Sequence, residues 1–132
     1  MSATTDVEEA IMNVAVIGAS NKPERYSYQA VKKLAEHGHR PLPVHPSLTL
    51  VDDIPVHKSL AELPEPVDTV SLYLSAKNQD GLLEDILASG AGRVIFNPGT
   101  ENPELEDALR ARGIAAVRAC TLVLLRTGQF NP

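Results

Sequence analysis

Short apolar runs alternate along the chain with segments in which apolar residues recur at helical spacing. Apolar runs bounded by turn residues are typical of strands buried on both faces of a sheet, and spacings of three and four residues are typical of amphipathic helices. The predicted strands cover residues 13–18, 41–44, 67–74, 93–96 and 114–117, and the loop 47–58 leaves room for a short strand at 54–57.

Serine, proline and glycine residues mark where the predicted helices begin and end. A serine side chain can accept a hydrogen bond from a free amide in the first turn, and glycine readily takes the left-handed conformation after the last turn. Ser59, with Glu62 three residues later, also matches the capping-box pattern. We therefore predict that helices begin at Ser27, Ser59, Ser75 and Pro103, and that they end at Gly38, Pro64, Gly90 and Gly113.

The alternation of strands and helices predicts an α/β fold, with helices on both faces of a mostly parallel sheet. We expect a three-layer, Rossmann-like domain of five or six strands over residues 13–132, preceded by a tail or short helix at 1–12. The strand number stays open because the apolar segment 120–126 could close the sheet or form a short helix. Pro41 and Pro43 are awkward in a central strand, since proline cannot donate to the ladder.

Charge and composition narrow the range of partners. The 132-residue chain has a formal net charge of −5, which disfavours nucleic acids and anionic membranes because both attract a basic field. No apolar stretch approaches the ~18–20 residues of a membrane span, and the acidic N-terminus is unlike a secretory signal, so a cytoplasmic location is expected. A single cysteine, Cys120, excludes a disulfide within the chain, and the four histidines show no metal-ligand spacing.

The loop after the first predicted strand carries the main functional signal. Small residues at Gly18, Ala19 and Ser20 let the backbone approach a diphosphate, and the helix that follows offers free N–H groups and the positive end of its dipole. Lys22 and Arg25 add positive charge beside these groups, and the Ser27 hydroxyl adds a donor. This pattern predicts an anion site for a nucleotide at the carboxyl end of the first strand.

Two departures argue against a dinucleotide as the ligand. The G-x-G-x-x-G fingerprint is absent, and no acid follows the second strand, where Val44, His45 and Pro46 stand instead of the carboxylate that binds the NAD ribose. Neither is a basic residue that would favour NADP obvious there, since Arg40 precedes the strand. An NAD(P)-binding redox enzyme or sensor with a shortened Rossmann motif nevertheless stays open as an alternative function.

The same residues resemble a known family. Val-Ala-Val-Ile-Gly-Ala-Ser from position 14, the motif Pro43-Val-His-Pro46, and the segments 59–64, 97–102 and 119–124 are similar to the CoA-binding domain proteins related to the N-terminal domain of the succinyl-CoA synthetase α subunit. The resemblance implies a Rossmann-like fold that binds coenzyme A at the strand ends. By position it implies contacts from Gly18, Ala19, Ser20, Lys22, Arg25, Ser27, Val44, His45, Pro46, Leu74, Ser75, Ala76, Asn97, Pro98 and Gly99.

No catalytic constellation is visible in the sequence, and the resemblance carries ligand binding without the ligase reaction. We therefore expect non-catalytic binding of coenzyme A or acyl-CoA, in a carrier, a sensor or a partner subunit of an acyl-CoA enzyme. A homodimer is the default assembly, because two-fold dimers are the commonest oligomers. Cys120 follows the last predicted strand, where it is either a buried apolar residue or a thiol able to react with that of the cofactor.

Overall fold

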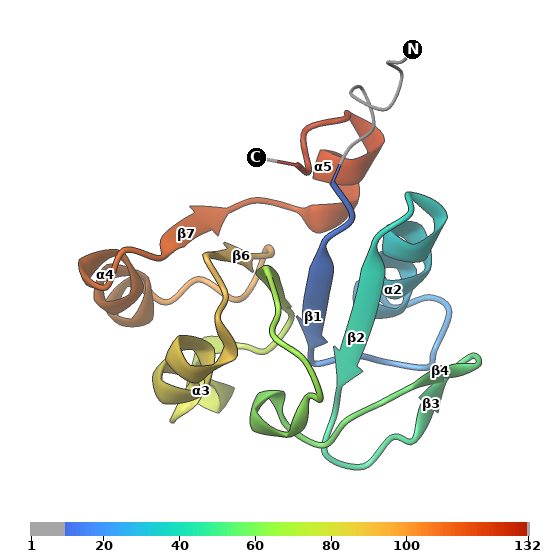
Figure 1. The fold of residues 1–132 in the computed structure, drawn as a ribbon, viewed down its shortest axis with the longest axis horizontal. Helices are drawn as coiled ribbons and strands as arrows, with labels where there is room; N and C mark the ends of the chain where they lie inside the picture. The colour runs from blue at the N-terminus through green and yellow to red at the C-terminus, as the bar shows by residue number, and fades with distance from the viewer. Residues whose placement is uncertain (1–9, 132) are drawn as a thin grey trace.

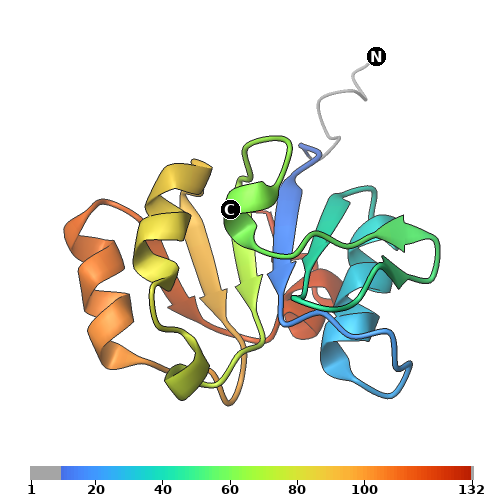
Figure 2. The ribbon, with the colours of Figure 1, turned by 90° about the horizontal axis from the view of Figure 1, so that it is seen from below.

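The computed structural model describes residues 10–131, and its centre is a sheet of five strands that all run parallel (Figures 1 and 2). The order β2-β1-β5-β6-β7 confirms the predicted α/β, Rossmann-like class. The strands are β1 (Asn13–Ile17), β2 (Arg40–Val44), β5 (Thr69–Leu72), β6 (Arg93–Phe96) and β7 (Ala115–Arg118).

Helices cover both faces of this sheet, as Figure 1 shows in side view. On one face, α2 (Tyr26–Glu36) and α5 (Thr121–Arg126) pack Val31, Leu34 and Leu125 against β1 and β6. The other face is covered by the short η1 (Leu60–Glu62), by α3 (Leu82–Ser89) and by α4 (Pro103–Ala111). The apolar segment that could have closed the sheet is therefore the helix α5.

Strand β2 forms one edge of the sheet, which explains its two prolines. The Arg40 N–H donates to the Met12 carbonyl, and the Val44 carbonyl accepts from Gly18, so alternate residues of β2 bond toward β1. Pro41 and Pro43 occupy the intervening positions, whose N–H groups would point away from β1. The missing donors therefore weaken no bond within the sheet.

The connection from β2 to β5 contains no long helix. It forms an antiparallel hairpin of β3 (Leu50–Val51) and β4 (Ile54–Pro55), followed by η1. Asp52 at the hairpin tip has a φ of 53° and binds α2, accepting from the Tyr28 hydroxyl at 2.9 Å and from the Lys32 ammonium at 2.6 Å. The hairpin is thereby fastened to the helix that begins at the predicted anion site.

The helix starts predicted at Ser27 and Ser75 are wrong, and the start at Ser59 is right but lacks the predicted cap. Ser27 lies inside α2, where it is buried; the N-cap is Arg25, whose side chain makes no capping hydrogen bond. Ser59 precedes η1 without a side-chain cap, so the capping box does not form there. Ser75 precedes only the short η2 (Ala76–Asn78), because Gly81, with a φ of 77°, separates that turn from α3.

Helix ends are predicted more reliably. Gly38, Gly90 and Gly113 follow α2, α3 and α4 with φ values of 85°, 85° and 81°, as the left-handed C-terminal turn requires. The predicted tail at 1–12 lies outside the described residues except for positions 10–12. No helix of residues 10–131 is both long and apolar enough to cross a membrane.

Candidate functional site

The candidate site lies at the carboxyl ends of β1 and β5, where the strand order reverses. From β1 the chain continues to β2 on one side, and β5 pairs with β1 on the other, which creates the crevice where open α/β sheets bind ligands. A hollow of about 710 Å³ opens there. It is lined by Gly18, Ala19, Ser20, Asn21, Lys22, Glu24, Arg25, Tyr26, Ser27, His45, Leu48, Tyr73 and Leu74.

Gly18 brings the ends of β1 and β5 together at the floor of this hollow. Its φ is 88°, and a Cβ atom there would lie 3.1 Å from the Tyr73 carbonyl carbon and 3.2 Å from Leu74 Cδ2. Both the backbone conformation and the close approach therefore require glycine.

Three amides of the loop after β1 already donate hydrogen bonds within the protein. The N–H groups of Gly18 and Ala19 both donate to the Val44 carbonyl at 3.1 Å, and the Lys22 N–H donates to the Ser20 hydroxyl at 3.0 Å. The backbone approach expected at Gly18 and Ala19 therefore brings none of these three N–H groups to a diphosphate: the Val44 carbonyl of β2 accepts the hydrogen bonds of Gly18 and Ala19, and the Ser20 hydroxyl accepts that of Lys22.

A cluster of free donors lies at the start of α2. The N–H groups of Tyr26, Ser27 and Tyr28 make no hydrogen bond to any described residue, and the first helical bond runs from Gln29 to the Arg25 carbonyl at 3.1 Å. Three free amides at the positive end of an eleven-residue helix are an arrangement suited to binding an anion.

Two cations stand beside these amides without partners. Lys22 and Arg25 line the hollow, are exposed, and form no ion pair within residues 10–131, although Glu24 lies between them in the same loop. By contrast, Lys32 and Lys33 of α2 are paired with Asp52 and Glu36. The helix start thus collects positive charge that the protein does not neutralise.

A second, more apolar hollow of about 330 Å³ adjoins the first and shares Gly18, His45 and Leu74 with it. The His45 Nδ1 accepts the amides of Ser47 and Leu48 at 3.0 and 3.1 Å, which leaves the ring proton on Nε2. The other lining residues are Ile17, Val44, Pro46, Lys58, Ser59, Leu60, Leu82 and Asp85.

Together the two hollows bring together ten of the fifteen residues predicted from the sequence. The other five, Ser75, Ala76, Asn97, Pro98 and Gly99, line neither.

Asn97 has a structural role in the loop after β6. Its amide nitrogen donates to the Ser71 hydroxyl at 3.1 Å and to the Leu72 carbonyl at 3.0 Å, and its oxygen accepts from the Thr121 amide at 2.8 Å. With 1% exposure, the side chain joins β5, β6 and α5 and leaves no polar atom for a ligand.

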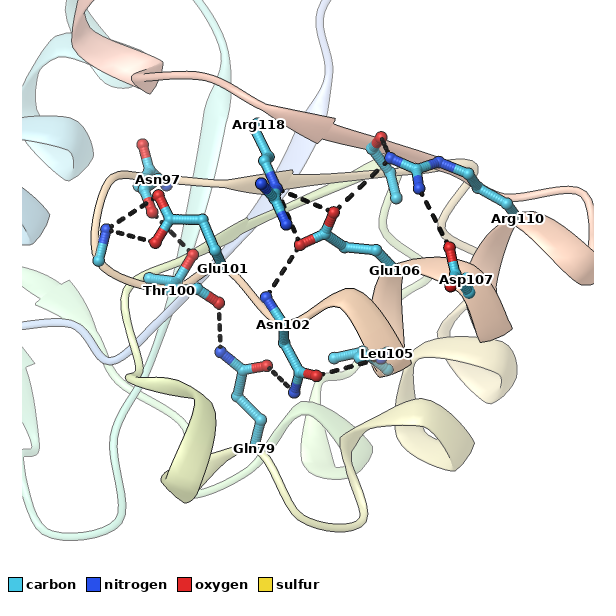
Figure 3. A network of polar contacts seen from close by, with 12 residues as sticks. Gln79, Asn97, Thr100, Glu101, Asn102, Leu105, Glu106, Asp107, Arg110 and Arg118 are labelled. Atoms are coloured by element: carbon cyan, nitrogen blue, oxygen red, sulfur yellow. Dashed lines mark hydrogen bonds and ion pairs between the residues drawn. The ribbon is translucent and has the colours of Figure 1, made fainter.

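The rest of that loop is held by the polar network of Figure 3. The Gly99 N–H donates to Glu101, and the buried Gln79 donates to the Thr100 carbonyl at 2.9 Å and accepts from Asn102 at 2.9 Å. These bonds tie the segment after β5 to the start of α4, where the Asn102 side chain also caps the helix by accepting from the Leu105 N–H at 3.2 Å. Turn-making and capping therefore explain Glu101 and Asn102.

Sequence reasoning missed residues that reach the hollows from distant segments. Tyr73 follows β5, and burial raises its pKa to about 12, so its hydroxyl stays protonated at neutral pH. Lys58 lies in the connection after the β3–β4 hairpin, Leu82 and Asp85 lie in α3, and all three line the smaller hollow. Only the pairing of strands and the packing of α3 reveal these neighbours.

A parallel sheet with a hollow at its switch point defines a domain of the Rossmann-like class, in which ligands bind at this crevice. The chain matches the family model described as CoA binding domain over residues 12–126. It belongs to that family, which confirms the resemblance seen in the sequence.

Related proteins agree with this assignment. An uncharacterized protein of Bacillus subtilis, YneT, is 27% identical over 76% of this chain and 74% of its own length. The alpha subunit of an ADP-forming acetate–CoA ligase from Pyrococcus furiosus is 31% identical over 76% of this chain, which spans only 25% of that subunit. A crystal structure of an uncharacterized protein, 40% identical, superposes with a TM-score of 0.86 and covers 92% of this chain and 99% of that one.

Proposed function

We propose that this protein binds coenzyme A, free or acylated, without transforming it. The observation that carries the proposal is the pair of unneutralised cations, Lys22 and Arg25, beside three free amides at the start of α2. Membership of the CoA binding domain family supports the same ligand. A cofactor with a diphosphate supplies the negative charge that this helix start lacks.

The two hollows suggest how the cofactor lies. The diphosphate binds the start of α2, in the larger hollow. The adenine enters the smaller, apolar hollow beside Val44, His45 and Pro46, because flat aromatic bases prefer apolar surroundings with a few polar contacts. The pantetheine arm leaves past Leu74, toward the exposed Ser75 and Ala76.

The proposed biological role rests on binding coenzyme A and not on catalysing a reaction of it. The match covers only 25% of the related acetate–CoA ligase subunit, so the ligase reaction of that whole subunit is not carried over to this chain. We propose instead that this chain acts as a carrier, a sensor or a partner subunit of an acyl-CoA enzyme. On this view, incubation with acetyl-CoA releases no free thiol, which a thiol reagent such as Ellman's reagent would measure. Release of thiol above the protein-free rate would identify a hydrolase or transferase instead.

A ligand panel tests the proposal directly. Thermal unfolding is followed with CoA, acetyl-CoA, NAD, NADP and ATP, each titrated to saturation. A ligand at about 100 times its dissociation constant stabilises the folded state by ~2.7 kcal/mol, and we expect this only for the CoA species. Stabilisation by NAD or NADP, with none by CoA, would establish the redox alternative.

Arg25→Ala should weaken CoA binding by about 1–2 kcal/mol, because it removes a charge-assisted contact from an exposed position. The dissociation constant, measured by calorimetry, would then rise about 5- to 30-fold. Arg112→Ala is the matched control, since Arg112 is also exposed and forms no ion pair with any residue of 10–131, but lines neither hollow. Equal affinities for the two variants would remove Arg25 from the binding site.

A further inference from the structure

We propose that Lys58 recognises the ribose phosphate of the bound nucleotide, and thereby selects coenzyme A over nucleotides with an unphosphorylated ribose. The inference rests on the proposed function and assigns one residue to one group of the ligand. Lys58 is a lining residue of the smaller hollow and its only cation within residues 10–131.

Backbone pairing places Lys58 beside the end of β2. Val44 and His57 form an isolated parallel bridge: the His57 N–H donates to the Pro43 carbonyl at 3.0 Å, and the His45 N–H donates to the His57 carbonyl at 2.9 Å. The residue after His57 therefore emerges next to His45, although thirteen positions separate them in the sequence. This single bridge holds the residues around His57 against the outer side of the edge strand β2.

The carboxyl end of the second strand is where Rossmann-type sites read the ribose. An acid there binds the two free hydroxyls of an NAD ribose, and a basic residue accommodates a phosphate on the ribose. No carboxylate follows β2 here, and Lys58 supplies positive charge at the same place from another segment. The geometry therefore favours a phosphorylated ribose over a free diol.

The charge of Lys58 is available to a ligand. Its side chain is exposed and forms no ion pair with any described residue; Asp85, the acid in the same hollow, is not within 4.0 Å of it. Arg40 cannot bind the ribose phosphate in this way, because it lies at the opposite end of β2 and forms an ion pair with Glu65 at 2.9 Å. A flexible ammonium with three donors suits a phosphate monoester, which carries nearly two negative charges at neutral pH.

The test compares ligands that differ by one phosphate. Calorimetry gives the dissociation constants of CoA and dephospho-CoA for the wild-type protein, for Lys58→Ala and for the control Lys77→Ala. Lys77 is also exposed and forms no ion pair in the described part of the chain, but it lines neither hollow. We expect the wild type and the control to prefer CoA by about tenfold, as a charge-assisted contact implies. Lys58→Ala should weaken CoA about tenfold and leave dephospho-CoA unchanged, so that the preference disappears.

Other results of these titrations distinguish failure of the role of Lys58 from failure of the proposed function. If CoA binds tightly and Lys58→Ala keeps the same preference over dephospho-CoA, the role of Lys58 is refuted and the proposed function stands. If neither ligand binds the wild type, the proposed function fails and this inference fails with it. NADP and NAD form the second arm: tighter binding of NADP than of CoA, lost in Lys58→Ala, would show that Lys58 reads a 2′-phosphate and would overturn the selection of coenzyme A.

Discussion

Gly18→Ala is expected to lower the free energy of unfolding by about 2–5 kcal/mol, since it combines a strained φ with overpacking against backbone. The new Cβ would lie 3.1 and 3.2 Å from the carbonyl carbon and oxygen of Tyr73, which belong to the neighbouring strand end and cannot move alone. Relief would require β1 and β5 to separate at the floor of the site. Urea unfolding of the two proteins measures the difference.

Gly38→Ala separates the two causes. Gly38 has nearly the same φ, 85° against 88°, but a Cβ there has no neighbour within 4 Å. That variant should lose about 1 kcal/mol from the backbone conformation alone. Similar losses for both variants would mean that the approach of Tyr73 to Gly18 is not a steric constraint.

Glu106 is the acid on which the start of α4 and the end of β7 depend. The side chain is 3% exposed and accepts from the Arg118 Nε at 3.0 and 3.1 Å and from the Asn102 N–H at 2.9 Å (Figure 3). Burial acts to raise its pKa, but these hydrogen bonds and the charges of Arg118 and Arg110 outweigh burial, and the pKa of Glu106 lies below its usual range. The carboxylate thus stays ionised inside the protein.

Glu106→Gln should destabilise the protein by about 2–4 kcal/mol at pH 7, because it removes the charge from a buried, hydrogen-bonded partner. A group whose pKa is lowered on folding stabilises the fold above its unfolded pKa, about 4.3 for glutamate. That stabilisation is lost as the pH falls through the lower pKa of the folded state. The difference between wild type and variant should therefore be complete at neutral pH and shrink in acid.

Urea unfolding at several pH values from neutral to strongly acidic measures this difference. Glu104→Gln is the control, because Glu104 lies on the same helix but is exposed and forms no ion pair with any described residue. We expect it to change stability by less than about 0.5 kcal/mol. A pH-independent loss in Glu106→Gln would show that the carboxylate acts through its shape and not through its charge.

Periodicity and turn residues predicted the fold well because they report local physics. The five strands of the parallel sheet, the glycines after α2, α3 and α4, and Pro103 at the start of α4 all follow from patterns within a few residues. The errors at Ser27, Ser59 and Ser75 arose because a serine near a helix start is only a candidate cap. Whether its side chain turns toward the first amides depends on tertiary packing, as the burial of Ser27 shows.

The candidate site was predictable where one loop builds it and hidden where separate segments meet. The loop from Gly18 to Ser27 is continuous, so its charges and small residues could be recognised together. Lys58 could not, because only the bridge between Val44 and His57 brings it to the end of β2. Asn97 was misplaced for a related reason: its loop ends at the correct edge of the sheet, but its amide is consumed by Ser71, Leu72 and Thr121.

The shared acceptor at Val44 bears on how this loop tolerates change over evolution. Because a main-chain oxygen anchors both Gly18 and Ala19, another apolar side chain at position 44 would preserve the anchor. Inserting one residue within the edge strand, however, would turn that oxygen away from the loop, since carbonyls alternate in direction along a strand. Exchange of one apolar side chain for another at position 44 thus leaves this anchor intact, whereas a change in the length of β2 would disassemble the loop without altering any of its own residues.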